Sequence, residues 1–261
     1  KEKKFYFSHK LMESKDLVSI ITACYNSENY ISETINSVFN QTYQNWELLM
    51  VDDCSTDNTK SLIKKFQKTE KRIKLFQLNE NSGAAVARNK AIKESKGTFI
   101  AFLDSDDNWL PKKLERQLEF MISNNYNLTH TAYELIDHQG NSLNKTIAPA
   151  KILGYKDMLY SNKIGCLTAI YNQRKIGKKY MPLLRKRQDY ALWLKILKTG
   201  EKAYGLAEVL SQYRNTENSI SDNKLNLIKW NWKLLREVEN LSFIKSVYYL
   251  SCNIIFKFLK R

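Results

Sequence analysis

Three carboxylates lie within four positions at residues 104–107, directly after a run of apolar residues. The segment FIAFLDSDDNW (99–109) places Asp104, Asp106 and Asp107 there. Carboxylates this close repel one another, and removing them from water is costly unless a positive group lies among them. A divalent cation is such a group, because two carboxylates of a D-x-D turn can face one hard ion that prefers oxygen ligands. An ion with few protein ligands also keeps open positions for phosphate oxygens.

The alternative for the same residues is a solvated acidic turn that begins the next helix. Asp106, Asp107 or Asn108 is a suitable N-cap for a helix starting near Trp109. D-x-D is short and common, so the surrounding elements have to decide between a cation site and a helix cap.

The first hundred residues alternate between strand and helix patterns. Short apolar runs predict strands over 17–23, 46–53, 72–78 and 98–104. Helical spacing predicts helices over 28–42, 55–66 and 82–97, the second beginning near Asn58 or Thr59 and the third ending at Gly97. This alternation predicts an α/β fold with a Rossmann-like, mostly parallel sheet, right-handed crossovers and helices on both faces.

Polar residues follow three of these strands, at the position where such sheets bind ligands. They are residues 22–26, the pair Asp52 and Asp53, and residues 104–107. Because the carboxyl ends of parallel strands lie at one edge of the sheet, we expect these residues to meet in one crevice.

The second half of the chain is less regular. Residues 111–125 predict an amphipathic helix, and residues 128–137, 166–172 and 202–214 predict strands. Residues 187–200 predict a helix that ends at Gly200 and turns Trp193, Ile196 and Leu197 toward the core.

The composition favours a folded core and anionic partners. Of 261 residues, 43% are hydrophobic, enough to bury a core. The net charge of +15 favours nucleic acid, phosphorylated metabolites or an anionic membrane. The four cysteines are isolated, so we expect reduced thiols of a cytoplasmic protein and no zinc site. We expect no signal peptide after KEKKFYF, and no run reaches the length of a membrane-spanning helix.

Several motifs together are similar to those of the family 2 glycosyltransferases with the GT-A fold. They are VSIITACYNSENYISETINSVFNQTYQNWELLMVDDCSTDNT, GAAVARNKAI, GTFIAFLDSDDNWLP, RQDYALWLKIL and LSQYRNTENSIS, in this order. The resemblance covers about residues 17–222 and implies a bacterial enzyme that builds capsule, lipopolysaccharide or other surface glycans. It divides the chain into a leader (1–16), a glycosyltransferase domain with a nucleotide-binding half (17–110) and an acceptor-side half (111–222), and a C-terminal helical tail (223–261).

The resemblance implies a uridine site at the end of the first two strands. Backbone groups of Thr22 and Ala23, with the ring of Tyr25, would hold the uracil base, since an aromatic face is a rigid platform for a nucleobase. Many relatives carry proline at the position of Ala23. Asp53 would accept a hydrogen bond from uracil N3–H, a donor that cytosine lacks. For one member of the pair Asp52 and Asp53, the alternative is a turn cap.

The resemblance also implies roles for the acidic turn. Asp106 would ligate Mn²⁺ or Mg²⁺ between the two phosphates, and Asp104 would bind the ribose or the ion and its water. Asp107 would contact the donor sugar or the ion, and Ser105 belongs to the same nucleotide site. Arg88 would reach a phosphate or a neighbouring carboxylate; its alternative is a position on a helix surface.

Asp189 is the expected catalytic base. An inverting transfer needs one group to take the proton of the acceptor hydroxyl as it attacks the anomeric carbon. Relatives usually carry Glu-Asp where this chain has Gln188 and Asp189. The structural alternative for Asp189 is a carboxylate that favours the helix dipole. Tyr213, Arg214 and the loop 215–221 resemble a mobile segment that closes over the donor.

The C-terminal tail predicts a basic amphipathic helix. Residues 224–261 carry eight basic and two acidic side chains. Such a helix favours contact with the cytoplasmic membrane surface, as suits a polyprenyl-linked glycan acceptor. The alternatives are packing on the enzyme core and a homodimer interface.

Two other functions compete with an inverting, metal-dependent transfer from a UDP-sugar. A nucleotidyltransferase that makes sugar nucleotides would have a glycine-rich phosphate loop after the first strand, where this chain has TACYNSEN. A nucleic-acid-binding protein would interleave basic and aromatic residues on its binding face, whereas the expected crevice is acidic, so we expect no nucleic acid partner.

Overall fold

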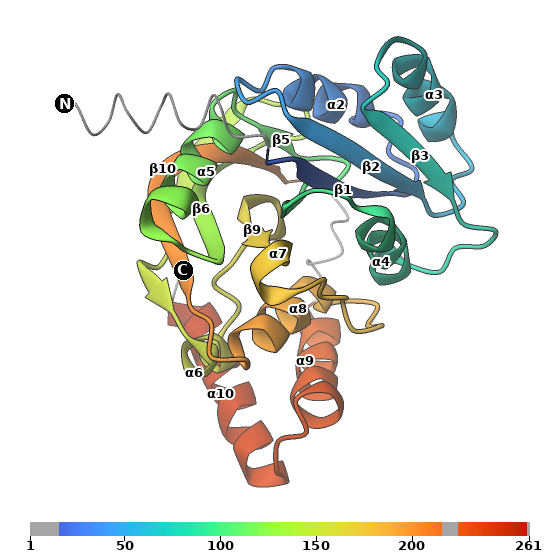
Figure 1. Ribbon diagram of the computed structural model, residues 1–261. Helices are drawn as coiled ribbons and strands as arrows, with labels where there is room; N and C mark the ends of the chain where they lie inside the picture. Colours follow the sequence, from blue (N-terminus) through green and yellow to red (C-terminus); the bar gives the residue numbers. More distant parts are fainter. Residues whose placement is uncertain (1–15, 216–223, 260–261) are drawn as a thin grey trace.

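The computed structural model describes residues 16–215 and 224–259. Its first half alternates strands with helices, as the apolar runs predict (Figure 1). The strands are β1 (Val18–Cys24), β2 (Trp46–Asp52), β3 (Ile73–Gln77) and β4 (Phe99–Phe102). The intervening helices are α2 (Ile31–Phe39), α3 (Thr59–Thr69) and α4 (Ala84–Glu94).

The second half adds antiparallel strands and short helices to the same sheet. Its strands are β5 (Asn108–Trp109), β6 (Leu128–Ile136), β7 (Ser142–Ile147), β8 (Ile152–Leu153), β9 (Ile170–Asn172) and β10 (Ala203–Arg214). Its helices are α5 (Lys113–Asn124), α6 (Tyr155–Tyr160), the 3₁₀ turn η1 (Cys166–Thr168), α7 (Gln173–Ile176) and α8 (Gln188–Leu197). The tail forms α9 (Lys224–Lys233), the π-helical turn η2 (Leu234–Val238) and α10 (Phe243–Leu259).

One mixed sheet runs through the molecule in the order β3-β2-β1-β4-β9-β6-β10-β5. The strands β1 to β4 are parallel, which confirms the Rossmann-like half of the prediction. In contrast, β9 is antiparallel to both of its neighbours, and β5 is antiparallel to β10. The parallel strands therefore end together, and β10 returns to the same edge of the sheet.

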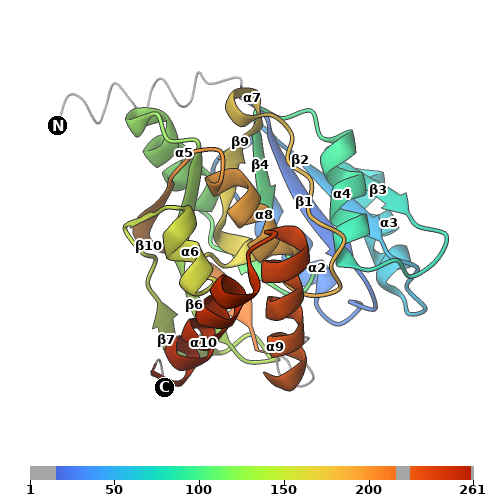
Figure 2. The ribbon, with the colours of Figure 1, turned by 90° about the horizontal axis from the view of Figure 1, so that it is seen from below.

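The helices cover both faces of the sheet because adjacent residues of a strand point to opposite sides. In β1, Ile20 packs in one cluster with Ile35 of α2, and Ile21 packs in another with Ala87 of α4 and Trp193 of α8. Figure 2 shows α9 and α10 lying over α6 and α8, with α4 at the same face of the sheet. Within the described residues, no helix is both long and apolar enough to cross a membrane.

Two local predictions are wrong. Residues 166–172 form the turn η1 before the three-residue strand β9, where the prediction was one longer strand. The helix α4 is capped by Ser95, so Gly97 does not end it. Gly97 lies against β1 instead, since a Cβ at this position would come within 2.5 Å of the Leu17 carbonyl oxygen.

Candidate active site

The acidic turn lies between β4 and β5, and β10 brings an arginine beside it. Trp109 of β5 pairs with Ser211 of β10, so the end of β10 reaches the turn. The main-chain N–H of Arg214 donates to Asp107 Oδ1 at 2.9 Å, and its Nε donates to the Asp106 carbonyl oxygen at 2.8 Å. Arg214 thus holds the turn through a side-chain oxygen of Asp107 and the main-chain carbonyl of Asp106, the residue before it.

The rest of the Arg214 guanidinium is also fully engaged. Its Nη2 donates to Glu33 Oε2 of α2 at 2.6 Å, and Nη1 lies 3.3 Å from the carbonyl oxygens of Asp137 and His138. The residue is only 2% exposed, so it joins α2, the acidic turn and the β6–β7 hairpin from inside the protein. Arg214 is therefore a structural part of the site, whereas the sequence indicated part of a mobile segment. Most of the loop of that segment, residues 216–221, lies outside the described residues.

The acidic turn concentrates negative charge in a buried place. Burial, followed by the charge of Asp104, raises the pKa of Asp106 to about 6. Burial and the carboxylates of Asp106 and Asp104 raise the pKa of Asp107 well above its ordinary value, although Arg214 lowers it in part. The buried Oδ2 of Asp107 has no hydrogen-bond partner. A cation at this turn would offset both the burial and the mutual repulsion that raise these two pKa values.

The turn does not cap the helix that follows it. The next helix, α5, begins at Lys113 with Lys112 at its N-cap, and β5 separates it from the aspartates. The structural alternative for Asp106, Asp107 and Asn108 is therefore wrong.

Arg88 of α4 pairs directly with the first aspartate of the turn. Its Nη2 lies 2.5 Å from Asp104 Oδ1, and the residue is 7% exposed. Burial opposes the charge of Arg88, but the carboxylates of Asp104 and Asp189 help to raise the pKa of its guanidinium. Arg88 therefore meets a neighbouring carboxylate, one of its two expected partners, and is not a surface residue.

Asp189 lies in the first turn of α8. Its carboxylate is half-buried and accepts a hydrogen bond of 3.4 Å from Asn162 Nδ2. The negative charge of Asp189 helps to raise the pKa of Arg88 and that of the buried Cys166 thiol, and the charge of Asp104 does the same. Asp107, the last aspartate of the turn, and Asp189 are 82 positions apart in the chain. The fold nevertheless brings both the turn and Asp189 close enough to influence the same arginine, Arg88. No motif marks Asn162, so its position beside Asp189 was not predictable from the sequence.

The uridine-site candidates gather at the end of β1. Tyr25 is 50% exposed, so its ring is accessible to a ligand. Thr22 is buried and its Oγ1 has no partner, and Ala23 beside it is half-buried. Ser105 reaches this segment from the acidic turn, with its Oγ 2.7 Å from the Oγ of Ser27. The ends of β1 and β4 therefore meet, as the parallel sheet predicts.

The two aspartates after β2 differ in their contacts. Asp53 accepts main-chain N–H bonds from Ser82 and Gly83, both at 2.8 Å, at the entry to α4. Asp53 thus ties the end of β2 to the start of α4. Asp52 is 1% exposed and accepts a bond of 3.3 Å from the Ser55 N–H, three residues on, so it is the member of the pair that caps the turn; its Oδ1 has no partner.

The site holds no ready-made metal cage. Within the part of the chain that the structure describes, no three His, Cys, Asp or Glu side chains form a group able to hold an ion. All four cysteines are free thiols. The carboxylate oxygens of the acidic turn suit a hard divalent ion, and any ion there would need further ligands from its substrate.

Comparisons with known proteins agree on one family. The family model described as "Glycosyl transferase family 2" matches residues 19–181. The chain is 46% identical over 234 residues to the putative teichuronic acid biosynthesis glycosyltransferase TuaG of Bacillus subtilis (strain 168), covering 90% of this chain and 93% of that protein. It is 43% identical over 236 residues to the UDP-Glc:alpha-D-GlcNAc-diphosphoundecaprenol beta-1,3-glucosyltransferase WfgD of Escherichia coli, covering 90% of each.

A solved structure shows the same fold. The crystal structure of S. aureus TarS 1-349 in complex with UDP-GlcNAc superposes with a TM-score of 0.71 and 23% identity, covering 89% of this chain and 70% of that one. The GT-A-like fold, with its mostly parallel sheet and its C-terminal helix, is thereby confirmed. The chain belongs to glycosyl transferase family 2 and is a glycosyltransferase.

Proposed function

We propose that the protein moves a hexosyl or N-acetylhexosaminyl group from a UDP-sugar to a hydroxyl of a glycan or polyprenyl-linked glycan, with inversion. The product would belong to a bacterial capsule, lipopolysaccharide or exopolysaccharide. The observation that carries the proposal is that Arg88 pairs with Asp104 of the acidic turn and is also reached by the charge of Asp189. The relative WfgD is named for a UDP-glucose donor and a diphosphoundecaprenol acceptor, and TarS was solved with UDP-GlcNAc.

The nucleotide would bind at the ends of β1 and β2. The exposed ring of Tyr25 would stack on the uracil, beside main-chain groups of Thr22 and Ala23. Asp53 would accept the uracil N3–H. Each of its oxygens already accepts one main-chain N–H and retains a second lone pair for this bond.

Asp104 and Asp106 would hold a divalent metal, with Asp107 and Ser105 beside it at the donor. A bound Mn²⁺ or Mg²⁺ would neutralise charge on the leaving diphosphate, so that no general acid is needed. Arg88 fixes Asp104 by its ion pair, and Arg214 fixes the main chain at Asp106. A solved mannosyltransferase of the same fold, PcManGT from Pyrobaculum calidifontis, is described in complex with GDP-Man and Mn2+.

Asp189 would act as the general base. It would take the proton of the acceptor hydroxyl as that oxygen attacks the anomeric carbon from the face opposite the diphosphate. A well-placed base contributes about 10²–10⁴ in rate. Asn162 donates to Asp189 and so orients the carboxylate.

The acceptor's lipid would keep the enzyme at the cytoplasmic surface of the membrane, with contact through the C-terminal tail. We retain the division into a leader (1–16), a catalytic domain (17–222) and a tail (223–261) as part of this proposal. A homodimer through the tail is the competing arrangement.

The experiment is a panel of sugar nucleotides assayed for UDP release with a lipid-linked acceptor, in which wild type is compared with Asp189→Asn. We expect the variant to lose about 10²-fold or more in kcat while its affinity for UDP is unchanged. Asp157→Asn is the matched control, because Asp157 only caps α6. Full transfer by Asp189→Asn would overturn the assignment of the base.

A further inference from the structure

The C-terminal helix α10 carries a continuous apolar face that points away from the protein. Ile244 is 81% exposed, and other large side chains share this face. In full, the exposed face of α10 consists of Phe243, Ile244, Val247, Tyr248 and Ile255. These are half of the exposed large hydrophobic side chains in the described residues, while the others are scattered over several elements. A patch of this kind marks a surface that meets a partner.

The opposite face of α10 is already packed, so the exposed face cannot be explained as part of the core. Asn253 Nδ2 donates to the Leu159 carbonyl oxygen of α6 at 2.9 Å. The ring of Tyr249 lies edge-on to that of Tyr160, with 5.2 Å between the ring centroids. These contacts fix the rotation of α10 about its own axis, which leaves the exposed face turned outward.

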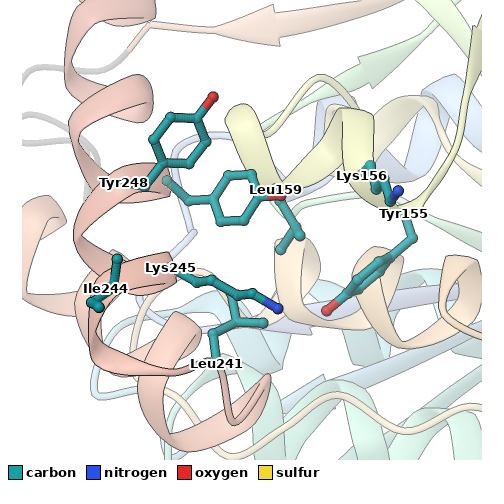
Figure 3. A pocket seen from close by; sticks show the side chains of 8 residues that line it. Tyr155, Lys156, Leu159, Leu241, Ile244, Lys245 and Tyr248 are labelled. Atoms are coloured by element: carbon teal, nitrogen blue, oxygen red, sulfur yellow. The ribbon is translucent and has the colours of Figure 1, made fainter.

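A groove of about 390 Å³ runs between α6 and α10 (Figure 3). Apolar and aromatic side chains form most of it, and two lysines, one from each helix, complete it. The lining residues are Tyr155, Lys156, Leu159, Leu241, Ile244, Lys245, Tyr248 and Tyr249. Ile244 and Tyr248 belong both to the groove and to the exposed face, so the two form one surface. Figure 3 shows the Lys245 side chain extending across the groove toward Tyr155.

The chemistry of this surface suits an anionic membrane better than a second copy of the chain. Exposed lysines beside exposed apolar and tyrosine side chains are typical of helices that lie in the interface of a bilayer. Lys245 and Lys156 are both exposed, and the sequence continues past Ile255 with Lys257, Lys260 and Arg261. Two copies meeting through this face would bring their lysines together around it, and like charges repel.

We propose that α10 lies in the surface of an anionic phospholipid bilayer. Its exposed face is inserted among the lipid chains, the α6–α10 groove takes up part of one chain, and Lys156 and Lys245 bind lipid phosphates. This inference rests on the proposed function, because it names the surface on which a lipid-linked acceptor is presented to the enzyme.

The helix α6 connects this surface to the expected base. On one side, α6 binds Asn253 of α10 through the Leu159 carbonyl oxygen, and on the other its Met158 carbonyl oxygen accepts from Tyr190 Oη at 2.5 Å. Tyr190 directly follows Asp189 in α8. A membrane bound by α10 therefore has a fixed position relative to Asp189, as a lipid-linked acceptor requires.

The test is co-sedimentation of the full chain with vesicles, without any nucleotide or acceptor. Equimolar phosphatidylglycerol and phosphatidylethanolamine vesicles are compared with phosphatidylcholine vesicles. We expect binding to the anionic vesicles only, and a loss of about tenfold or more for the double variant Ile244→Glu, Val247→Glu. Lys245→Glu should weaken binding about tenfold as well, because it changes the charge by two.

Two matched controls separate this surface from a general effect of charge. Leu143→Glu changes an exposed apolar residue of β7, and Lys65→Glu changes an exposed lysine of α3; both should bind vesicles like wild type. Binding of the double variant at the wild-type level, or no binding of wild type to anionic vesicles, overturns the proposal. A dimer of wild type in light scattering that the double variant converts to a monomer, without vesicle binding, also overturns it.

Vesicle binding can be tested separately from the glycosyl transfer proposed above. Affinity for UDP is measured on the same variants and should equal that of wild type. Loss of vesicle binding with retained UDP binding thus tests α10 alone, whereas absence of UDP binding in wild type would contradict the proposed function.

Discussion

Arg214 donates its main-chain N–H to Asp107 Oδ1 at 2.9 Å, across 107 positions of the chain. The same residue donates from Nε to the Asp106 carbonyl oxygen and pairs with Glu33. A buried guanidinium with a planar set of donors thereby holds the acidic turn against α2. The geometry of the proposed metal ligands depends on this arginine, although it contacts neither the nucleotide nor the ion in our proposal.

Arg214→Lys should weaken binding of UDP with Mn²⁺ and lower the thermal stability. Lysine keeps the charge but cannot reproduce the separate contacts of Nε, Nη1 and Nη2. We expect about tenfold weaker binding in calorimetry and a loss of roughly 2–4 kcal/mol in the free energy of unfolding. Arg116→Lys, which alters a more exposed arginine paired with Glu208, should change stability by less than about 1 kcal/mol. If the two variants lost the same UDP affinity and the same free energy of unfolding, Arg214 would not be holding the turn.

Asp106→Asn should abolish the metal-dependent part of UDP binding. With Mn²⁺ present and UDP at 100 times its dissociation constant, the free energy of unfolding of wild type should rise by about 2.7 kcal/mol. That gain corresponds to a rise of roughly 5–10 °C in Tm for a chain of this size. EDTA should remove the rise in wild type, and the variant should lack it. A rise that survives EDTA in wild type would argue against a bound cation.

Glu47 should make stability depend on pH in the acid range. Its carboxylate accepts from Ser19 Oγ, Lys74 Nζ and the Lys96 N–H. Burial alone would raise the pKa of Glu47, but the bonds from Lys74, Ser19 and Lys96 outweigh it and lower the pKa below its ordinary 4.5. Its contribution is therefore complete above the unfolded-state pKa and is lost as the pH falls through the lower, folded-state pKa.

Glu47→Gln tests this dependence by urea unfolding between pH 7 and pH 3. The variant should lose roughly 2–3 kcal/mol at pH 7, and this loss should shrink as the pH falls below 4.5, because wild type then begins to lose the same contribution. Glu94→Gln, in an exposed pair with Lys90, should change stability little at either pH. A constant difference between wild type and Glu47→Gln over the whole range would contradict the assignment.

The first half of the fold was predictable because β1, β2 and β4 are buried on both faces. Runs such as 48–51 contain only apolar residues, and parallel strands covered by helices require this pattern. Asn58, one of the two residues predicted near the start of α3, occupies its N-cap position. The boundary at Gly97 was misjudged because a glycine after a helix is usually a cap, whereas here it permits a close approach to β1 that only the tertiary structure reveals.

The motifs marked the acidic turn, Arg88 and Asp189, and they predicted a neighbouring carboxylate as one partner of Arg88, but they did not predict the contacts of Arg214 or Asn162. Arg214 reaches Asp107 only because β10 pairs with β5 in one register, which no local pattern specifies. Asn162 follows a short helix and lies near Asp189 through packing alone. For the tail, the amphipathic pattern predicted the helix, but it did not show which face packs on α6 and which is exposed.

The central claim is that a cation at the acidic turn holds the diphosphate of a UDP-sugar. Anomalous diffraction from crystals grown with UDP and Mn²⁺ tests it most directly. We predict one manganese peak within coordination distance of the Asp106 carboxylate and of both phosphates, with the uracil beside Tyr25. Nucleotide bound elsewhere, or bound at this position with no manganese at Asp104 and Asp106, would contradict the claim.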